Sequence, residues 1–184
     1  MSEYYLISQL PSLDGIGDGA PVPITEDRFL DLCNRFLNKK ALMKMEKLTI
    51  SPPIEADNTG NDLIDAWNEG ERNLRLVLCK TRADRMNKDF VLPQKTYPVD
   101  LIKIASAALE TENPLEAEKF LLRHRLNYLE TLRPMDIFSE EYIFYYALKL
   151  KLIMRIRRFD EAVGEATYKN IYNSILSGDR LEAK

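Results

Sequence analysis

The segment from Ile143 to Ile156, IFYYALKLKLIMRI, constrains the fold more than any other part of the chain. Its apolar residues cover nearly the whole circumference of a helix, whereas a surface helix has one apolar stripe. Such a helix is either central in its own domain or partly sheltered by a partner. Lys149, Lys151 and Arg155 interrupt the run, which is shorter than the roughly 20 residues of a membrane span. We therefore expect a helix packed in protein, with no direct membrane insertion.

Helix start and stop signals divide most of the remaining chain. Thr25 is a good N-cap, and two acidic residues follow it in the first turn, where the helix dipole favours negative charge. Asn113 is an N-cap followed by Pro114, which suits the first helical position, and Ser139 precedes the apolar run as a third N-cap. The first predicted helix runs from Thr25 to Leu37, with KKALMKMEKL as a second short helix. Two helices follow over about Asp62–Asn87 and Val99–Glu110. The last three run from Asn113 to Pro134, from Ser139 to a break near Phe159 and Asp160, and from that break to Gly178.

The segments between these helices are irregular. Tyr4 to Leu10 is expected to be a short strand or an extended arm, Asp14 to Pro23 an irregular loop, and Ser51 to Gly60 a linker. Alternating β-branched runs are missing elsewhere, and no clear repeat indicates a solenoid. We therefore expect an all-α fold of antiparallel helical bundles, with about six helices and a short extended N-terminal segment.

The domain prediction is a single helical domain over residues 1–184, with a possible subdivision into an N-terminal helical part, 1–50, and a main helical bundle, 61–184.

Apolar residues at helical spacing predict which faces are buried. The predicted buried residues are Phe29, Leu30, Cys33, Phe36 and Leu37 in the first helix, Leu63, Trp67, Leu74 and Leu78 in the long helix, Ile102, Ala105 and Leu109 in the next, and Leu115, Leu122, Leu126 and Leu129 in the helix after Asn113.

Composition excludes several classes of protein. The chain has 26 basic and 29 acidic residues and a net charge of −3, which argues against a nucleic-acid surface because tracking phosphates requires a cationic excess. Cys33 and Cys79 lie in apolar helical patterns without metal-like spacing, and we expect buried free thiols in a reducing compartment. The opening MSEYYLISQLPS has no basic region and no long apolar run, so we expect no secretory signal and a cytoplasmic location.

Catalytic and cofactor motifs are also missing. Gly15, Gly17 and Gly19 are spaced as G-x-G-x-G and are followed by prolines, whereas dinucleotide binding requires G-x-G-x-x-G before a helix. His124 is the single histidine, so it forms no metal pair and is expected on a helix surface. We predict no cofactor, no metal and no enzyme activity. The rival hypothesis, an all-α enzyme, requires a deep pocket with convergent polar groups.

Charged and aromatic residues on the two longest helices suggest contacts. Glu71, Arg75 and Arg82 lie on or beside the apolar stripe, and Glu71 and Arg75 have the favourable order for an i, i+4 pair. The apolar run contributes aromatic residues and a basic C-terminal end, which is read as a solvated helix end, a protein contact or a nucleic-acid contact. The candidate residues for partner binding or an inter-helix network are Glu71, Arg75, Arg82, Tyr145, Tyr146 and Arg155.

The same helices carry a resemblance. WNEGERNLRLVLCKTRA, from Trp67 to Ala83, resembles the E-x-x-N-L-R-x-x-L helix of the C-type subunit of prokaryotic V/A-type ATPases, which is called d in eukaryotes, although Glu71 lies closer to Asn73 than in that pattern. The opening YYLISQLPSLDG and the later segments NPLEAEKFLLRHRLNYLETL and YALKLKLIMRIRRFDEAVG resemble an uncharacterised bacterial family associated with V-type ATPase operons that lack an ordinary C-type subunit.

The resemblance implies an architectural role. The C-type subunit is a funnel of helical bundles that sits on the membrane rotor ring, holds the foot of the central stalk and has no active site. It is much longer than this chain, so the resemblance implies a reduced subunit, a self-associating one or an assembly factor. We therefore expect a non-catalytic subunit or accessory factor of a V/A-type proton- or sodium-translocating ATPase. Its partners would be the central stalk and rotor ring, with a possible homo-oligomer and a location peripheral to the inner membrane through the complex. The alternative is a general helical adaptor unrelated to ATPases.

Overall fold

The computed structural model describes residues 2–16, 21–55, 58–93, 97–157 and 161–179, and every regular element within these ranges is an α-helix. The all-α prediction is confirmed, but eight helices are described where about six were expected. They are α1 (Ser2–Ser8), α2 (Glu26–Phe36), α3 (Lys39–Lys47), α4 (Asp62–Arg85), α5 (Val99–Glu110), α6 (Pro114–Thr131), α7 (Glu140–Arg157) and α8 (Glu161–Asp179).

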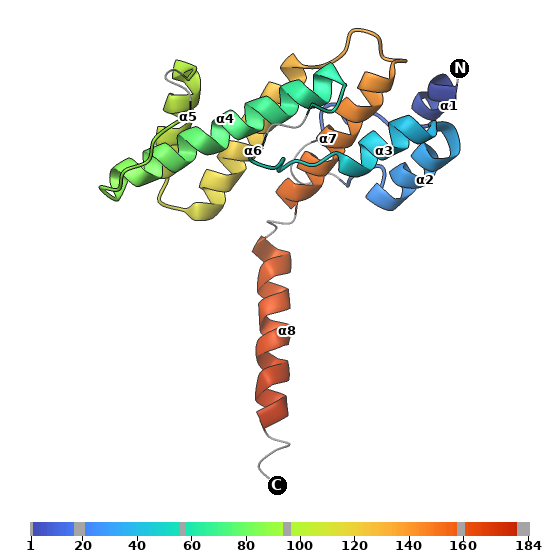
Figure 1. Cartoon of the computed structure of the whole chain (residues 1–184). Helices are drawn as coiled ribbons and strands as arrows, with labels where there is room; N and C mark the ends of the chain where they lie inside the picture. The colour runs from blue at the N-terminus through green and yellow to red at the C-terminus, as the bar shows by residue number, and fades with distance from the viewer. Residues whose placement is uncertain (1, 17–20, 56–57, 94–96, 158–160, 180–184) are drawn as a thin grey trace.

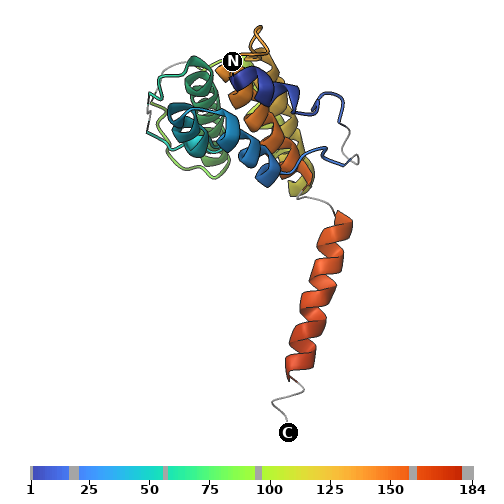
Figure 2. The ribbon, with the colours of Figure 1, turned by 90° about the vertical axis from the view of Figure 1, so that its right-hand side faces the viewer.

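Seven of these helices pack into one body, and α8 projects away from it. Figure 1 shows α4 running along the body, with α5 beside one of its ends and α1 to α3 gathered toward the other, and Figure 2 shows the same body turned by 90°. The closest helix pairs are α4 with α5, α6 with α7, α1 with α2, α5 with α6, and α4 with α7. Both views place α8 clear of the other helices.

The predicted N-caps act as expected. The Thr25 hydroxyl accepts from Arg28 N at 3.2 Å, and Asn113 Oδ1 accepts from Leu115 N at 2.9 Å. Ser139 Oγ accepts from Tyr142 N at 3.2 Å at the start of α7. Each bond satisfies a backbone N–H that the first helical turn leaves without a partner. Two further caps were not predicted, and they begin α3 at Asn38 and α4 at Asn61.

The larger core cluster surrounds α7. Ten residues of this helix are buried, and all of them except Lys149 pack with residues of α1, α2, α3, α6 and the first part of α4. Trp67 of α4 is completely buried in the same cluster. The apolar run is therefore a central helix, which explains why it is apolar on nearly all sides.

A smaller core cluster lies between the second part of α4, α5 and the start of α6. Leu74, Val77 and Leu78 of α4 pack against Ala105 and other small or apolar residues there. The predicted stripe of the long helix is confirmed, since all four of its residues are buried. Because this stripe contributes to both clusters, α4 connects the two halves of the body.

The prediction of a short extended segment at the N-terminus is wrong, because residues 2–8 form helix α1. Leu6 is completely buried and Ile7 packs beside it against the larger cluster, while Tyr4 and Tyr5 are exposed. This spacing gives the segment one buried and one exposed helical face. Burial against α2 therefore stabilises a helix that is too short to form alone.

Several predicted faces are also corrected. Ile102 of α5 is exposed, and the helix instead packs through Leu101, Ile104, Ala105 and Ala108. Leu30 of α2 is exposed. Cys33 is buried as predicted, but Cys79 is exposed, because the face of α4 that carries it is turned away from α5 and α6. Gly17, Gly19 and the break at Phe159 and Asp160 lie outside the described residues.

Candidate functional site

Glu71 lies in an ion-pair network that joins three helices. Its side chain is 2% exposed and accepts two hydrogen bonds from Arg125 of α6, both at 2.9 Å. Arg125 also lies 3.9 Å from Glu118 of α6, and Glu118 accepts from Arg155 of α7 at 2.9 Å. Two candidates from the sequence, Glu71 and Arg155, therefore take part in one network within the chain.

Arg75 and Arg82 lie outside this network. The predicted i, i+4 pair of Glu71 with Arg75 is wrong, because Glu71 pairs with Arg125 and the guanidinium of Arg75 donates to the Pro52 carbonyl. Arg82 is exposed and makes no ion pair among the residues that the structure describes. Arg82 is therefore accessible to a partner, whereas Arg75 holds the segment before α4.

Tyr145 belongs to a polar contact centred on Lys149. The Tyr145 hydroxyl donates to Glu130 at 2.8 Å and accepts from Lys149 Nζ at 3.2 Å. Lys149 Nζ also lies 2.6 Å from Glu130 and donates to Asp14 at 2.5 Å. Burial by itself lowers the pKa of Lys149, but these hydrogen bonds outweigh it and raise the pKa above its usual range. Burial and the bond to Glu130 raise the pKa of Tyr145 to about 12.

Tyr146, the remaining candidate, also makes its contacts inside the body. Its hydroxyl donates to the Pro11 carbonyl at 2.8 Å, and its ring stacks on Phe29 at 5.5 Å between centroids. Of the readings left open for the basic end of this helix, a solvated position is wrong for Lys149, which is buried, whereas the side chains of Lys151 and Arg155 stay 29% and 41% exposed. Each of them pairs with an acidic residue of another segment of the chain, namely Asp14, Glu26 and Glu118 respectively.

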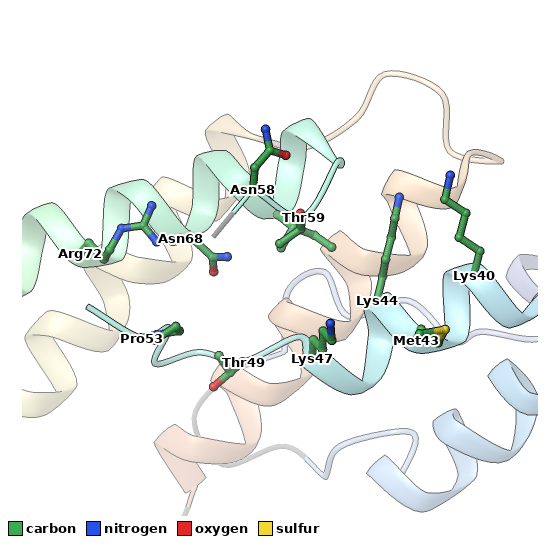
Figure 3. Close-up of a pocket in the computed structure, with 11 residues that line it drawn as sticks. Lys40, Met43, Lys44, Lys47, Thr49, Pro53, Asn58, Thr59, Asn68 and Arg72 are labelled. Atoms are coloured by element: carbon green, nitrogen blue, oxygen red, sulfur yellow. The ribbon is translucent and has the colours of Figure 1, made fainter. Parts of the chain in front are cut away.

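A basic cavity lies between α3 and α4, and we call it the α3–α4 cavity. It has a volume of about 620 Å³. Figure 3 shows Lys40, Lys44 and Lys47 on α3 at one side of it and Arg72 on α4 at the other, with Thr49 and Pro53 of the connecting segment along one edge. Its described lining residues are Lys40, Met43, Lys44, Lys47, Thr49, Pro53, Asn58, Thr59, Ile64, Asn68 and Arg72, and none of these is acidic.

The cations of the α3–α4 cavity differ in their partners. Lys44 lies 3.6 Å from Glu140 and donates to the Gly60 carbonyl at 3.3 Å. Lys40, Lys47 and Arg72 have no hydrogen bond or ion pair of their side chains within the described ranges. This site was not predicted from the sequence. The available signal was the i, i+3, i+4, i+7 spacing of Lys40, Met43, Lys44 and Lys47, which places all four on one helical face.

A second cavity, of about 330 Å³, lies beside the crossing of α4 and α6 and is lined by His124 and Gly70, among others. His124 is half-buried, so its predicted surface position is only partly right. Burial and the nearby charge of Arg125 lower the pKa of His124, which favours the neutral imidazole at pH 7. Tyr128 packs directly on Gly70 and donates to the Ala66 carbonyl at 2.9 Å, so this crossing requires glycine.

The second feature that was not predicted from the sequence is the apolar side of α8. Tyr168, Ile171, Tyr172 and Ile175 are between 51% and 67% exposed, and the two tyrosine rings stack at 6.1 Å between centroids. Their i, i+3, i+4, i+7 spacing places them on one side of the helix. We call these four residues the α8 stripe. The same spacing is visible in the sequence and was the available signal.

The described residues offer neither a metal site nor a membrane span. Among them, no group of histidine, cysteine and acidic side chains has a geometry that would hold a metal ion. None of the helices within those ranges combines the length and the apolar character needed to cross a bilayer.

Comparison with known proteins gives one match. The model of a family described as "Protein of unknown function (DUF2764)" matches residues 89–179, just under half of the chain, from the segment before α5 to the end of α8. Comparison with curated proteins and with solved structures finds no match. Over the range that contains the central helix α7 and the α8 stripe, the chain is thus similar to a family whose function is unknown.

Proposed function

We propose that this protein is a non-catalytic subunit or assembly factor of a V/A-type ATPase, similar in role to the C-type subunit, and that α8 attaches it to another protein of the complex. The observation that carries the protein-binding part of the proposal is the α8 stripe, which stands clear of the body. The resemblance of Trp67–Ala83 and of the other quoted segments to the V-type ATPase families indicates which complex.

The stripe has the chemistry of a helix that docks into a groove. Apolar anchors at i, i+3, i+4 and i+7 are the pattern by which amphipathic helices bind grooves on other proteins. Tyrosine and isoleucine contribute large contact areas, and tyrosine tolerates an interface that is partly wet. We therefore expect the occupant to be an apolar groove between helices of the central stalk.

The rest of the molecule suits a rigid connecting element. The central helix α7 is buried on nearly all sides, and Arg155 and Lys149 tie it to neighbouring segments. A body braced in this way resists deformation when its outer surface is loaded, as transmission of torque between stalk and ring requires.

The energetics indicate that α8 does not act alone. Burying each of four half-exposed apolar side chains contributes about 1–2 kcal/mol. Association costs about 4–15 kcal/mol in lost freedom of motion. The gain from the stripe is of the same order as this cost, so stable attachment requires a second contact on the body.

The test is affinity purification of the tagged full chain from solubilised membranes of its own organism, followed by mass spectrometry. We expect stalk and rotor-ring subunits of the ATPase to be recovered. Ile171→Asp with Ile175→Asp places two charges on the stripe and should lower recovery by about tenfold or more. Asn170→Asp with Ser174→Asp is the matched control, because it adds the same charges at the same spacing on a side of α8 that faces away from the stripe.

Three results would count against the proposal. Recovery of defined partners without any ATPase subunit would favour the general adaptor. Equal loss with both double variants would show that α8 binds through overall charge. Dimerisation that depends on Ile171 and Ile175, measured by light scattering after size-exclusion chromatography, would make a second copy the occupant of the stripe.

A further inference from the structure

We propose that the α3–α4 cavity binds an acidic, extended segment of a partner protein. The inference deepens the proposed function, because it names the second contact that the energetics require. It rests on the charge, the shape and the lining of the cavity.

The charge of the cavity favours an anionic occupant. Four of its eleven described lining residues are basic and none is acidic, although the whole chain has a net charge of −3. Lys40, Lys47 and Arg72 make no ion pair or hydrogen bond with their side chains inside the described part of the chain. Like charges gathered at a concave surface repel one another and attract counter-charges, and an acidic ligand relieves that repulsion.

The shape of the cavity favours an extended occupant. Lys40 and Lys47 are seven residues apart on α3, which corresponds to about 10 Å along a helix. Arg72 lies at the other side of the cavity, on α4 (Figure 3). An extended peptide rises about 3.3 Å per residue, so about three of its residues fit beside the row. A single phosphate group would be reached by only part of the row.

The uncharged lining matches a peptide as well. Met43, Pro53 and Ile64 provide apolar contacts between the cations, and Thr59 and Asn68 provide hydroxyl and amide groups. An acidic peptide with interspersed apolar side chains uses all of these, because its backbone can hydrogen-bond to the amide and hydroxyl groups. A compact polyphosphate uses the cations and leaves the apolar lining without a partner.

The test is direct binding of a fluorescein-labelled peptide, Glu-Leu-Glu-Glu-Leu-Glu, to the purified full chain, followed by fluorescence anisotropy at low salt. Lys40→Glu with Lys47→Glu should raise the dissociation constant by about tenfold or more. The matched control is Lys88→Glu with Lys103→Glu, which changes the net charge equally at exposed positions outside the cavity. The control should change the dissociation constant by less than about twofold.

The ligand class is tested by competition. Unlabelled Glu-Leu-Glu-Glu-Leu-Glu should displace the probe at lower concentration than Glu-Gly-Glu-Glu-Gly-Glu, which lacks the apolar side chains, and at lower concentration than inorganic tripolyphosphate. Tighter binding of tripolyphosphate would overturn the proposal in favour of a small phosphorylated ligand. Equal weakening by the two double variants, or undiminished binding by the cavity variant, would overturn the site itself.

The two proposals fail in different experiments. Ile171→Asp with Ile175→Asp should leave peptide binding unchanged, because the stripe does not line the cavity. The peptide assay contains no ATPase, so failure to recover ATPase subunits from membranes would reject the proposed function and leave the result for the cavity standing.

Discussion

The ion pair between Glu71 and Arg125 gives the sharpest stability prediction, because Glu71 is buried, Arg125 is largely covered and the bond is bidentate. Glu71 is 2% exposed and Arg125 is 13% exposed, with two hydrogen bonds of 2.9 Å between them. Removing one member of a buried pair typically costs about 3–5 kcal/mol, since the other charge remains buried without compensation. Arg125 retains some exposure and has Glu118 nearby, so we expect Glu71→Gln to lower the free energy of unfolding by about 3 kcal/mol.

The pairwise contribution is measured by a double-mutant cycle with Glu71→Met and Arg125→Met. Each single variant should lose about 3 kcal/mol, whereas the double variant should lose no more than either single one, because methionine at both positions fills space and leaves no buried charge. The coupling energy should therefore be at least about 3 kcal/mol. The assay is urea unfolding followed by far-ultraviolet circular dichroism, with the slope of the transition compared between variants.

Lys80 and Asp84 provide the matched control on the same helix. Their charged atoms are 2.7 Å apart, but both side chains are exposed. Asp84→Asn should lower the free energy of unfolding by less than about 1 kcal/mol, and added salt should reduce even this effect. A coupling energy below about 1 kcal/mol for Glu71 with Arg125 would refute the reasoning, because a close contact would then carry no more energy when buried than when exposed.

Three further outcomes are expected. Gly70→Ala should lower the free energy of unfolding, measured by urea titration, by about 2 kcal/mol, because the new Cβ overlaps the Tyr128 ring. Alanine favours helix by about 1 kcal/mol over glycine, so in a Tyr128→Ala background the same substitution should raise the free energy of unfolding. The hydrogen bond from Lys149 holds the pKa of Asp14 below its usual 3.8. The stabilisation by this pair is therefore complete above about pH 4 and is lost as the pH falls through the pKa of the folded state. The melting temperature of the wild type should exceed that of Lys149→Met by less below about pH 4 than above it. Cys79 should react with a thiol reagent in the native state, while the buried cysteine, whose pKa burial raises to about 12, should react only on unfolding.

Local signals in the sequence predicted the long helices well. The boundaries of α5 match the prediction, and the caps at Thr25, Asn113 and Ser139 lie where they were expected. These features depend on residues within one or two turns of each other, so a single segment contains the information. The lack of a polar side on α7 left two alternatives, a central helix or one sheltered by a partner, and its burial in the larger cluster decides for the first.

Features that depend on distant segments were predicted poorly. α1 forms because Leu6 finds a buried site in the larger cluster, which nothing within its short segment indicates. Glu71 had Arg75 as a suitable neighbour in its own helix, but it pairs with Arg125 of α6, because the bidentate guanidinium satisfies both carboxylate oxygens. The α3–α4 cavity likewise exists only once Arg72 is brought opposite the lysines of α3.

The residues that were singled out for contact and the residues that are available for contact are largely different sets. Five of the six predicted side chains, all except Arg82, use their hydrogen-bonding groups within the chain. Among the described residues, the α8 stripe and Lys40, Lys47 and Arg72 of the α3–α4 cavity are groups that remain available, as Arg82 does. Since both lie on one chain, occupation of one site raises the effective concentration of a partner at the other, by a factor that reaches about 10²–10⁴ when the geometry permits both contacts. Two individually weak contacts on a braced body would then give stable attachment without any single strong site.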